Sequence, residues 1–298
     1  MRLKRTAFAV LAAATVMGLS ACGDAGEDDT GNTPEVDVEE NAAEKFDDGT
    51  AMKDFAESGE ITIGVKIDQP GIGFMGATDE IPTGFDIEVA KMLAADLGIA
   101  AEDVEWKETI SDNREPFLQE GEVDLVVASY SIDPERRKIV GQAGPYYITG
   151  QQLMVQKDND AIQSVEDVKG EEVCSVTGST SLDQVEAKGA EPRGFDTYSE
   201  CRDQVLDGTV DAMTTDGSIL YGYVAENPDE LKVVGPEFST ERYAVGYPKE
   251  QPEMCEWIHG VIEESYDNGK WAKAFEATLG QSGVETPKPP TMDPCPTA

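Results

Sequence analysis

The chain has 298 residues, with 60 Asp or Glu against 23 Lys or Arg, and its formal net charge at pH 7 is -37. This charge would repel a phosphate backbone and excludes nucleic acid as a partner. The excess of acid favours solubility but does not identify a function.

The first residues predict a secretory signal. Three basic residues come first: Arg2, Lys4 and Arg5. The apolar stretch at 7–19 that follows is shorter than the about 20 residues of a membrane-spanning helix. Leu19-Ser20-Ala21-Cys22 resembles the bacterial lipobox. That resemblance implies a lipoprotein signal peptide at 1–21, cleavage before Cys22 and attachment of lipid, including palmitate, to the Cys22 thiol. The alternative is a plain secretory signal in which Cys22 is incidental.

Residues 22–54 are expected to form an acidic, disordered tether. The segment is crowded with carboxylates and has few apolar residues. Such a composition buries too little apolar surface to fold. A lipid anchor followed by a flexible spacer would hold a domain near a membrane without embedding it. Beyond the signal, no segment is apolar enough to span a bilayer.

Four cysteines remain besides Cys22, and an even number in an exported protein suggests two disulfides. Three pairings are possible. We favour Cys174–Cys201 with Cys255–Cys295, because each pair then stays within one stretch of chain. A zinc site is the alternative, although the chain has no C-x-x-C spacing and its one histidine is His259.

From about residue 61 the chain alternates predicted strands and helices. Residues 61–65 read as a strand, and a helix with Asp86 as N-cap runs to a stop at Gly98. The later elements continue the alternation: helix 115–119, strand 123–128, helix 134–140, strand 153–155, helix 164–168, strand 172–176, helices 181–187 and 201–206, strand 209–214, a helix through 219–223, strands 231–234 and 242–246, and helix 254–279. This order predicts α/β layers with parallel sheets.

A sequence pattern that occurs twice predicts two lobes of similar construction. Residues 121–127 (GEVDLVV) resemble 208–214 (GTVDAMT): in both, a helix ends at glycine and a strand follows. About 240 folded residues also fit two modest domains better than one.

The segment 129–136 (SYSIDPER) predicts a carboxylate-binding site. Two hydroxyls leave the end of a buried strand, Asp133 caps the next helix, and Arg136 lies one turn inside it. Hydroxyls, free helix N–H groups and a guanidinium that converge on one point bind an anion. The alternative is an ordinary strand-to-helix connection with a surface arginine.

These features together resemble the extracellular solute-binding proteins of family 3, the polar amino acid receptors of ABC importers. The similarity covers about 55–279. The matching pieces, specific in their order and spacing, are 61–65, 84–90, Asn113-Arg114, 121–124, 131–136, 144–147 and Asp216. Residues 64–71 and 143–147 resemble most the glutamate-binding lipoproteins of actinobacteria.

The resemblance implies a two-lobe α/β fold of the periplasmic-binding-protein type (type II). Each lobe would be a sheet flanked by helices, with two crossing hinge strands between them. Lobe 1 would comprise 55–150 and 244–298, and lobe 2 would comprise 151–243. The lobes would close around a ligand.

The resemblance also implies the ligand site. Arg136 and Ser131 match the clamp for the α-carboxylate, and the segment of Thr180 would add helix N–H groups to it. Asp216 matches the residue that takes the α-ammonium, helped by the carbonyl of Ser129.

Lys66, Ser111 and Arg114 match positions that face the ligand side chain. Two further cations in one cleft call for an anion between them, which favours glutamate, with aspartate next. The alternatives are that Arg114 pairs with a surface carboxylate, that Lys66 lies in solvent, or that Asp68 neutralises Lys66.

The implied function is that of a membrane-anchored substrate-binding subunit of an ABC amino acid importer. It would lie on the extracellular face of a Gram-positive type of cell membrane. It would act as a monomer with permease subunits, without cofactor or metal, and would not be an enzyme. The alternatives are a receptor for another polar amino acid such as glutamine, a ligand-sensing subunit of a membrane kinase, and, least favoured, an enzyme on the same fold.

Overall fold

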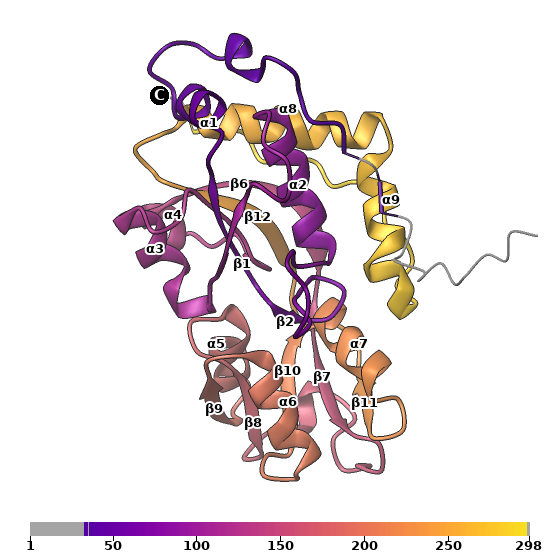
Figure 1. Ribbon diagram of the computed structural model, residues 1–298. Coiled ribbons are helices and arrows are strands. Elements are labelled where there is room, and N and C mark those ends of the chain that lie inside the picture. The colour runs from indigo at the N-terminus through magenta and orange to yellow at the C-terminus, as the bar shows by residue number, and fades with distance from the viewer. Residues whose placement is uncertain (1–32, 35, 297–298) are drawn as a thin grey trace, which may run out of the picture. The chain divides into compact units, whose positions relative to one another are not determined.

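The computed structural model describes residues 33–34 and 36–296. The predicted signal peptide and Cys22 lie outside the described residues. Two five-stranded sheets, each flanked by helices, form two lobes (Figure 1). The α/β class and the two lobes that the sequence predicts are therefore confirmed.

The strands of lobe 1 and a small hairpin attached to it are β1 (Thr62–Val65), β2 (Asp68–Gln69), β3 (Gly73–Phe74), β4 (Glu105–Glu108), β5 (Leu125–Val127), β6 (Gly141–Thr149) and β12 (Glu241–Tyr247). The strands of lobe 2 are β7 (Gln151–Gln156), β8 (Glu172–Val176), β9 (Glu191–Phe195), β10 (Ala212–Asp216) and β11 (Leu231–Val234).

The helices of lobe 1 are η1 (Ala42–Lys45), α1 (Ala51–Ser58), α2 (Phe85–Asp96), η2 (Ser111–Asn113), α3 (Arg114–Glu120), α4 (Arg136–Ile139), α8 (Glu253–Asp267), α9 (Lys270–Ala277) and η4 (Leu279–Ser282). Those of lobe 2 are η3 (Val165–Asp167), α5 (Thr180–Ala187), α6 (Tyr198–Leu206) and α7 (Gly217–Glu226). Arg136 is thus the first residue of α4 and not, as predicted, one turn inside a helix.

Both sheets are mixed, so the prediction of parallel sheets is only partly right. In lobe 1 the order is β4-β1-β5-β12-β6, with β4, β1 and β5 parallel and β12 antiparallel to both neighbours. In lobe 2 the order is β11-β7-β10-β8-β9, with β10, β8 and β9 parallel and β7 antiparallel. The parallel strands end at one edge of each sheet, where α/β proteins bind ligands.

Two stretches of chain cross between the lobes. The first runs from β6 through Gly150 into β7, and the second runs from β11 into β12. Residues 241–243 were predicted in lobe 2. They pair instead with Ile148, Thr149 and Tyr147 of β6 and so belong to the sheet of lobe 1.

The repeated Val-Asp motif, at 123–124 and 210–211, has the same role in both lobes. Asp124 accepts a hydrogen bond from the N–H of Thr62, and Asp211 accepts one from the N–H of Glu172, each over 2.8 Å. Each carboxylate therefore fixes the start of the neighbouring parallel strand, within a single lobe.

Each sheet is buried on both faces, which explains the continuous apolar runs. Leu125 and Val127 face the core that contains α2, α8 and α9, whereas Val126 faces a smaller core with α3. This alternation is the period of a strand. Phe85, which starts α2, is fully buried among Tyr146, Trp271 and other rings.

The predicted disordered tether is contradicted at its C-terminal end. The 3-10 helix η1 and the start of α1 lie inside residues 22–54, and Ala42 and Met52 are buried. The N–H of Glu39 also donates to the carbonyl of Ala95 in α2. In the sequence Ala42 and Met52 stand among acidic residues, and in the structure they anchor the segment to lobe 1. Among the described residues, no helix is both long and apolar enough to cross a bilayer.

The two disulfides that the sequence favours are confirmed. Cys174 of β8 is joined to Cys201 of α6, and Cys255 of α8 is joined to Cys295 of the C-terminal tail. Each bond stays within one lobe, so neither crosslinks the two lobes.

Replacing both Cys174 and Cys201 by alanine should lower the free energy of unfolding by about 3 kcal/mol, because the bond closes a loop of 27 residues in the unfolded chain. Urea denaturation followed by circular dichroism would measure the loss. A change below about 1 kcal/mol would contradict the expectation.

Candidate functional site

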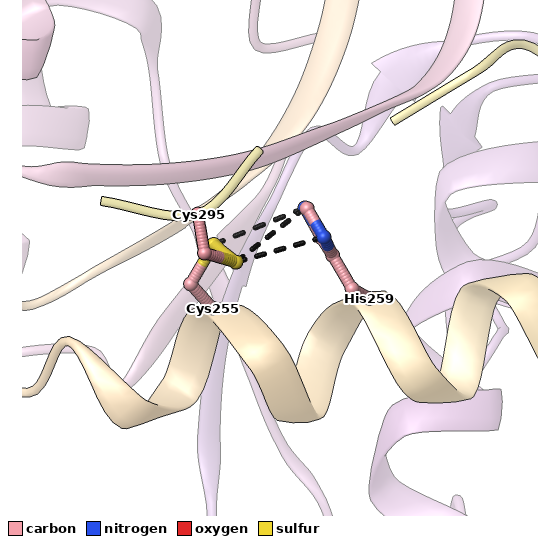
Figure 2. A group of neighbouring side chains, drawn as sticks. All are labelled: Cys255, His259 and Cys295. Carbon is pink, nitrogen blue, oxygen red and sulfur yellow. Dashed lines mark hydrogen bonds between the residues drawn. A yellow bond between two sulfur atoms is a disulfide. The ribbon is translucent and has the colours of Figure 1, made fainter. Parts of the chain in front are cut away.

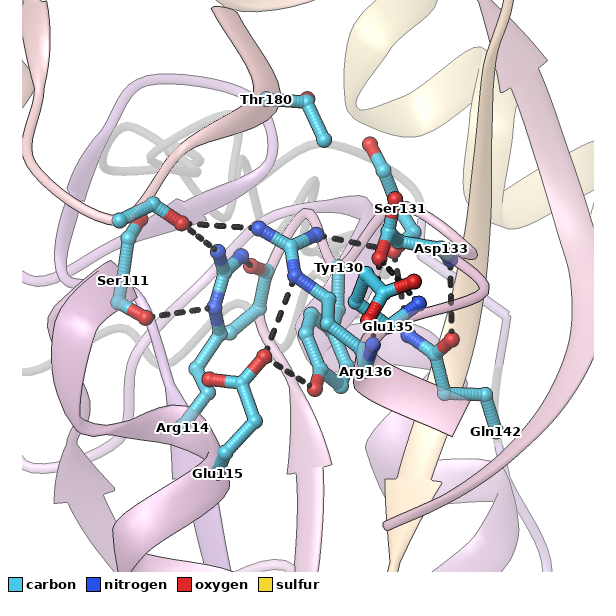
Figure 3. A network of polar contacts seen from close by, with 12 residues as sticks. Ser111, Arg114, Glu115, Tyr130, Ser131, Asp133, Glu135, Arg136, Gln142 and Thr180 are labelled. Carbon is cyan, nitrogen blue, oxygen red and sulfur yellow. Dashed lines mark hydrogen bonds and ion pairs between the residues drawn. The ribbon is translucent and has the colours of Figure 1, made fainter. Parts of the chain in front are cut away.

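Polar side chains gather where β1 and β5 of lobe 1 end, and they face the N-terminus of α5 in lobe 2. Lys66 directly follows β1, and Ser129 to Ser131 follow β5. Arg114 and Arg136 begin α3 and α4. Figure 3 shows the two guanidinium groups side by side within one polar network.

Arg136 is held by partners from three directions. Its Nε lies 3.1 Å from Glu115 Oε1, its Nη1 donates to the carbonyl of Ser131 over 2.9 Å, and its Nη2 donates to the carbonyl of Gly178 over 2.8 Å. Asp133 accepts from the backbone N–H groups of Glu135 and Arg136, although Glu135, and not Asp133 as predicted, occupies the N-cap position of α4. The guanidinium is thus fixed in orientation, with Gly178 on the opposite lobe.

Arg114 is more deeply buried and contacts four carbonyl groups. Its Nε donates to Ser111 O, its Nη1 donates to Ala128 O and, over 3.4 Å, to Ser129 O, and its Nη2 donates to Gly178 O over 3.2 Å. Burial and the neighbouring Arg136 lower the pKa of Arg114 to about 10. The alternative that Arg114 pairs with a surface carboxylate is wrong, because the residue is 2% exposed.

Tyr130 and Glu115 support both arginines, and the sequence analysis did not assign them to the site. The guanidinium carbons of Arg114 and Arg136 lie 4.6 and 5.1 Å from the Tyr130 ring centroid. The Tyr130 hydroxyl donates to Glu115 over 2.7 Å, and the same carboxylate pairs with Arg136. The position of Tyr130 between two site serines was the available signal.

Lys66 is also buried, so the alternative that it lies in solvent is wrong. Its side chain is 2% exposed, and its Nζ donates to Ser111 Oγ over 3.0 Å. Burial, and secondarily the charge of Arg114, lower the pKa of Lys66 to about 7. Close to neutral pH the charged and the neutral form of this amine are therefore both populated.

Asp68 does not bond to Lys66. Its carboxylate instead accepts from the N–H groups of Tyr198 and Ser199 in lobe 2. The alternative that Asp68 neutralises Lys66 is therefore reduced to a longer-range attraction, which raises the pKa of Lys66 less than burial lowers it.

The N-terminus of α5 supplies backbone donors on the lobe 2 side. Ser179 caps the helix and accepts from the N–H of Leu182. Within the described part of the chain, no acceptor bonds the N–H groups of Thr180 or Ser181. The Thr180 hydroxyl donates to Glu241 over 3.0 Å, so only the backbone of Thr180 remains for an anion.

Asp216, at the end of β10, is the acidic group of the site. One carboxylate oxygen accepts from the Tyr243 hydroxyl, and the other, Oδ1, has no hydrogen-bond partner among the described residues. Burial, and then the charge of Glu241, raise the pKa of Asp216 to about 8. A buried carboxylate with one bare oxygen favours a cationic partner.

Asp86 fixes the backbone that follows β5. Its prediction as a helix N-cap is wrong. Gly84 occupies the N-cap position of α2. The Asp86 carboxylate instead accepts from the N–H of Ser129 over 2.6 Å and from the Tyr146 hydroxyl over 2.7 Å. These bonds hold Ser129 at a φ of 43°, a conformation that few non-glycine residues adopt. The carbonyl of Ser129 is thereby directed toward Arg114.

The alternative zinc site does not fit the sulfur chemistry. Cys255, His259 and Cys295 do lie together, with His259 Nδ1 3.6 Å from Cys295 Sγ (Figure 2). Both sulfurs, however, belong to the same disulfide, and a metal needs thiolates.

The predicted site residues therefore come together in one region, and the positive and negative side chains lie in separate parts of it. Lys66, Arg114 and Arg136 form a cationic group around Ser111 and Gly178, whereas Asp216 leaves a bare oxygen next to the hinge. Such an arrangement can hold a molecule that carries both a carboxylate and an ammonium group.

Comparison with known proteins agrees with this chemistry. Residues 61–281 match the model of the bacterial extracellular solute-binding proteins, family 3. A glutamate-binding protein of Corynebacterium efficiens is 37% identical and aligns over 93% of this chain and 90% of its own. An ABC transporter glutamine-binding protein of Bacillus subtilis is 31% identical over 93% of this chain and 98% of its own.

Among solved structures, an ancestral amino acid-binding protein described as a precursor of cyclohexadienyl dehydratase is 31% identical. It covers 77% of this chain and 100% of its own, with a TM-score of 0.71. The chain belongs to the bacterial extracellular solute-binding proteins of family 3, and it is an amino acid-binding protein of the ABC importer type.

Proposed function

We propose that this protein binds glutamate, with aspartate as its next ligand, and presents it to the permease subunits of an ABC importer. The observation that carries the proposal is the excess of positive charge in the cationic group of lobe 1. Two guanidiniums share the carbonyl oxygen of Gly178, and a buried amine lies next to them. Among the described residues, Glu115 forms an ion pair with Arg136 alone. One carboxylate and a neutral oxygen offset the repulsion of three cations only in part, whereas two carboxylates on one ligand would offset the remainder.

The α-carboxylate would lie between Arg136 and the N-terminus of α5. A guanidinium held by Glu115 and Ser131 needs little reorganisation to bind it, and the N–H groups of Thr180 and Ser181 would complete its shell. Ser131 would add its hydroxyl.

The α-ammonium would bind Asp216 Oδ1 and the carbonyl of Ser129. This pairing would give the bare oxygen a partner and favour the ionised carboxylate. It would therefore lower the pKa of Asp216 from about 8.

The distal carboxylate would bind Lys66, Ser111 and Arg114. Because Asp68 is hydrogen-bonded to lobe 2, the charge of Lys66 stays available for the ligand. The relatives that bear the name glutamate-binding protein support this choice.

Glutamine is the second candidate, and one observation favours it. With a pKa of about 7, Lys66 is partly neutral at physiological pH and would then tolerate an uncharged amide. Relatives named as glutamine-binding proteins keep this candidate open.

For the whole chain, we propose export by residues 1–21, anchoring by lipid on Cys22 and a short acidic spacer up to about residue 41. The protein would act as a monomer on the extracellular face of the membrane. We also propose that it binds its ligand without chemical change, so that it is not an enzyme. The fold would close by rotation of lobe 2 against lobe 1 about the two crossings.

A calorimetric screen of all common amino acids tests the ligand, and Arg114→Ala tests how it is recognised. Glutamate should bind tightest to the wild type, and the substitution should weaken glutamate about tenfold more than glutamine, because only glutamate loses a charged partner. Tight binding of glutamine alone would reject glutamate as the ligand. Equal losses for both would show that Arg114 acts only through the carbonyls it holds.

A further inference from the structure

A second group of contacts joins the lobes away from the arginines. It involves Asp68 of β2, which lies in lobe 1, and the helices α6 and α7 of lobe 2. The carboxylate Oδ2 of Asp68 accepts from the N–H of Tyr198 over 2.8 Å and from the N–H of Ser199 over 3.2 Å. The Tyr223 hydroxyl of α7 donates to the carbonyl of the same aspartate.

The N-terminus of α6 is incomplete without Asp68. Thr197 and Glu200 form a capping box, in which Thr197 accepts from the N–H of Glu200 and Glu200 accepts from the N–H of Thr197. The N–H groups of Tyr198 and Ser199, the first two residues of the helix, are left for Asp68. A carboxylate in this position also meets the positive end of the helix dipole. One lobe therefore caps a helix of the other.

The turn that directly follows β2 also comes unusually close to α7, at Pro70. A Cβ placed on Gly222 would lie 2.3 Å from the carbonyl oxygen of Pro70 and 3.3 Å from its Cβ. That approach explains a glycine at this helical position, where alanine would otherwise favour the helix. The approach joins the two lobes, because Pro70 lies in lobe 1 and Gly222 in lobe 2.

We propose that Asp68 and Gly222 form a latch that sets the energy of lobe closure, so that Asp68 is a positioning residue for every ligand. The proposal rests on the proposed function, because it assumes that an amino acid binds between the lobes. Opening would return the Asp68 carboxylate and two helix N–H groups to water. Weakening the latch would lower the population of the closed form, and the apparent dissociation constant would rise by the same factor for any ligand.

The latch differs from a direct role of Asp68 beside Lys66. The charge of Asp68 raises the pKa of Lys66. If Asp68 acted only through Lys66, loss of its charge would leave Lys66 more often neutral and would weaken glutamate but not glutamine. Loss of the latch would weaken both ligands equally, so the two roles predict different results for the same substitution.

The test uses the full chain without its signal peptide and compares Asp68→Asn and Gly222→Ala with matched controls. Asp211→Asn removes a carboxylate that bonds a backbone N–H within lobe 2 alone. Gly260→Ala adds a methyl to α8, where a Cβ would meet nothing within 4 Å. Titration calorimetry with glutamate and with glutamine gives the dissociation constants, and thermal melts of the ligand-free variants give their stability.

Asp68→Asn and Gly222→Ala should each raise both dissociation constants by one common factor of about three to thirty. Gly222→Ala should melt at or above the wild-type temperature without ligand, because the open form relieves the contact and alanine favours the helix. The two controls should leave both constants unchanged. In the wild type, saturating glutamate should slow hydrogen exchange at the Tyr198 and Ser199 amides.

Several outcomes would overturn the latch. A loss confined to glutamate would assign Asp68 to Lys66. Unchanged constants in both variants would show that the contact does not limit closure. An equal loss in Asp211→Asn would show a general effect of stability. If the wild type binds no amino acid at all, the proposed function itself is wrong. That result is distinct from the three outcomes above, in which the wild type binds its ligand.

Discussion

Arg136→Ala should abolish measurable binding of every amino acid. The substitution removes the proposed partner of the α-carboxylate, a group that all amino acids share. A carboxylate left without its partner in a largely buried site costs about 3–5 kcal/mol, which corresponds to a loss of a few hundred- to several thousandfold in affinity. Titration calorimetry with glutamate and glutamine would measure it. Arg136→Lys should recover only part of the affinity, because an ammonium cannot bind bidentately.

The neighbouring arginine provides a matched control. The Arg137 guanidinium lies 3.0 Å from Asp293 of the C-terminal tail, and its side chain is 37% exposed. Arg137→Ala removes the same charge from the same short helix and should leave both affinities unchanged. Binding that survives Arg136→Ala, or an equal loss in the control, would refute the assignment of Arg136 to the α-carboxylate.

The expected loss is large because Arg136 is preorganised. Its three contacts to Glu115, Ser131 and Gly178 fix the plane of the guanidinium. A ligand carboxylate therefore has to displace or join one carbonyl contact and does not have to order a long side chain, which would cost about 2 kcal/mol. Glu115 and Tyr130 would act on the ligand only through the arginines that they support.

Besides the two-residue strands β2 and β3, three strands were not predicted, and these three share a physical cause. The strands β4, β6 and β9 lie at the edges of their sheets. An edge strand pairs on one side only and so tolerates proline and charge that a central strand excludes. Thus β6 contains Pro145, β9 contains Pro192 and Arg193, and β4 is Glu-Trp-Lys-Glu. Central strands such as β5 and β8 are apolar and were predicted.

The residues of the candidate site also differ in how well the sequence predicts their contacts. Arg136, Ser131 and Asp133 lie within six residues of one another, so local spacing predicts their association. The partners of Asp68 are 130 residues away in sequence, and those of Asp86 are 43 and 60 residues away. Only the folded chain brings these groups together, and each carboxylate looked locally like a helix cap or a counter-ion. The residues that set the geometry behind the site were therefore the hardest to predict.

Selectivity for glutamate over glutamine should fall as the pH rises above about 7. In the empty protein Lys66 loses its proton near this pH. A distal carboxylate would favour the charged amine and raise the pKa of Lys66 in the complex, so binding of glutamate takes up a proton. Above pH 7 the affinity for glutamate therefore falls by up to tenfold per pH unit. Glutamine has no distal charge, so its affinity does not depend on the protonation of Lys66 in this way.

The ratio of the two dissociation constants isolates Lys66 from the other titrating groups. Asp216, whose pKa is about 8, must ionise to bind the ammonium of either ligand, so its effect cancels in the ratio. The charges that act on Lys66 from its surroundings, those of Arg114, Asp68, Glu108 and Arg136, are present with both ligands. Between pH 6 and 8.5 the preference for glutamate should drop by about thirtyfold at most.

Calorimetry at these two pH values, in buffers of different ionisation enthalpy, would give both the ratio and the number of protons exchanged. Lys66→Met keeps an unbranched apolar stem and should make the ratio independent of pH while lowering it throughout. A wild-type ratio that stays constant from pH 6 to 8.5 would mean that Lys66 does not meet the distal carboxylate. Recognition of glutamate would then have to come from Arg114 and Ser111, whose charge state does not change in this range because the pKa of Arg114 stays near 10.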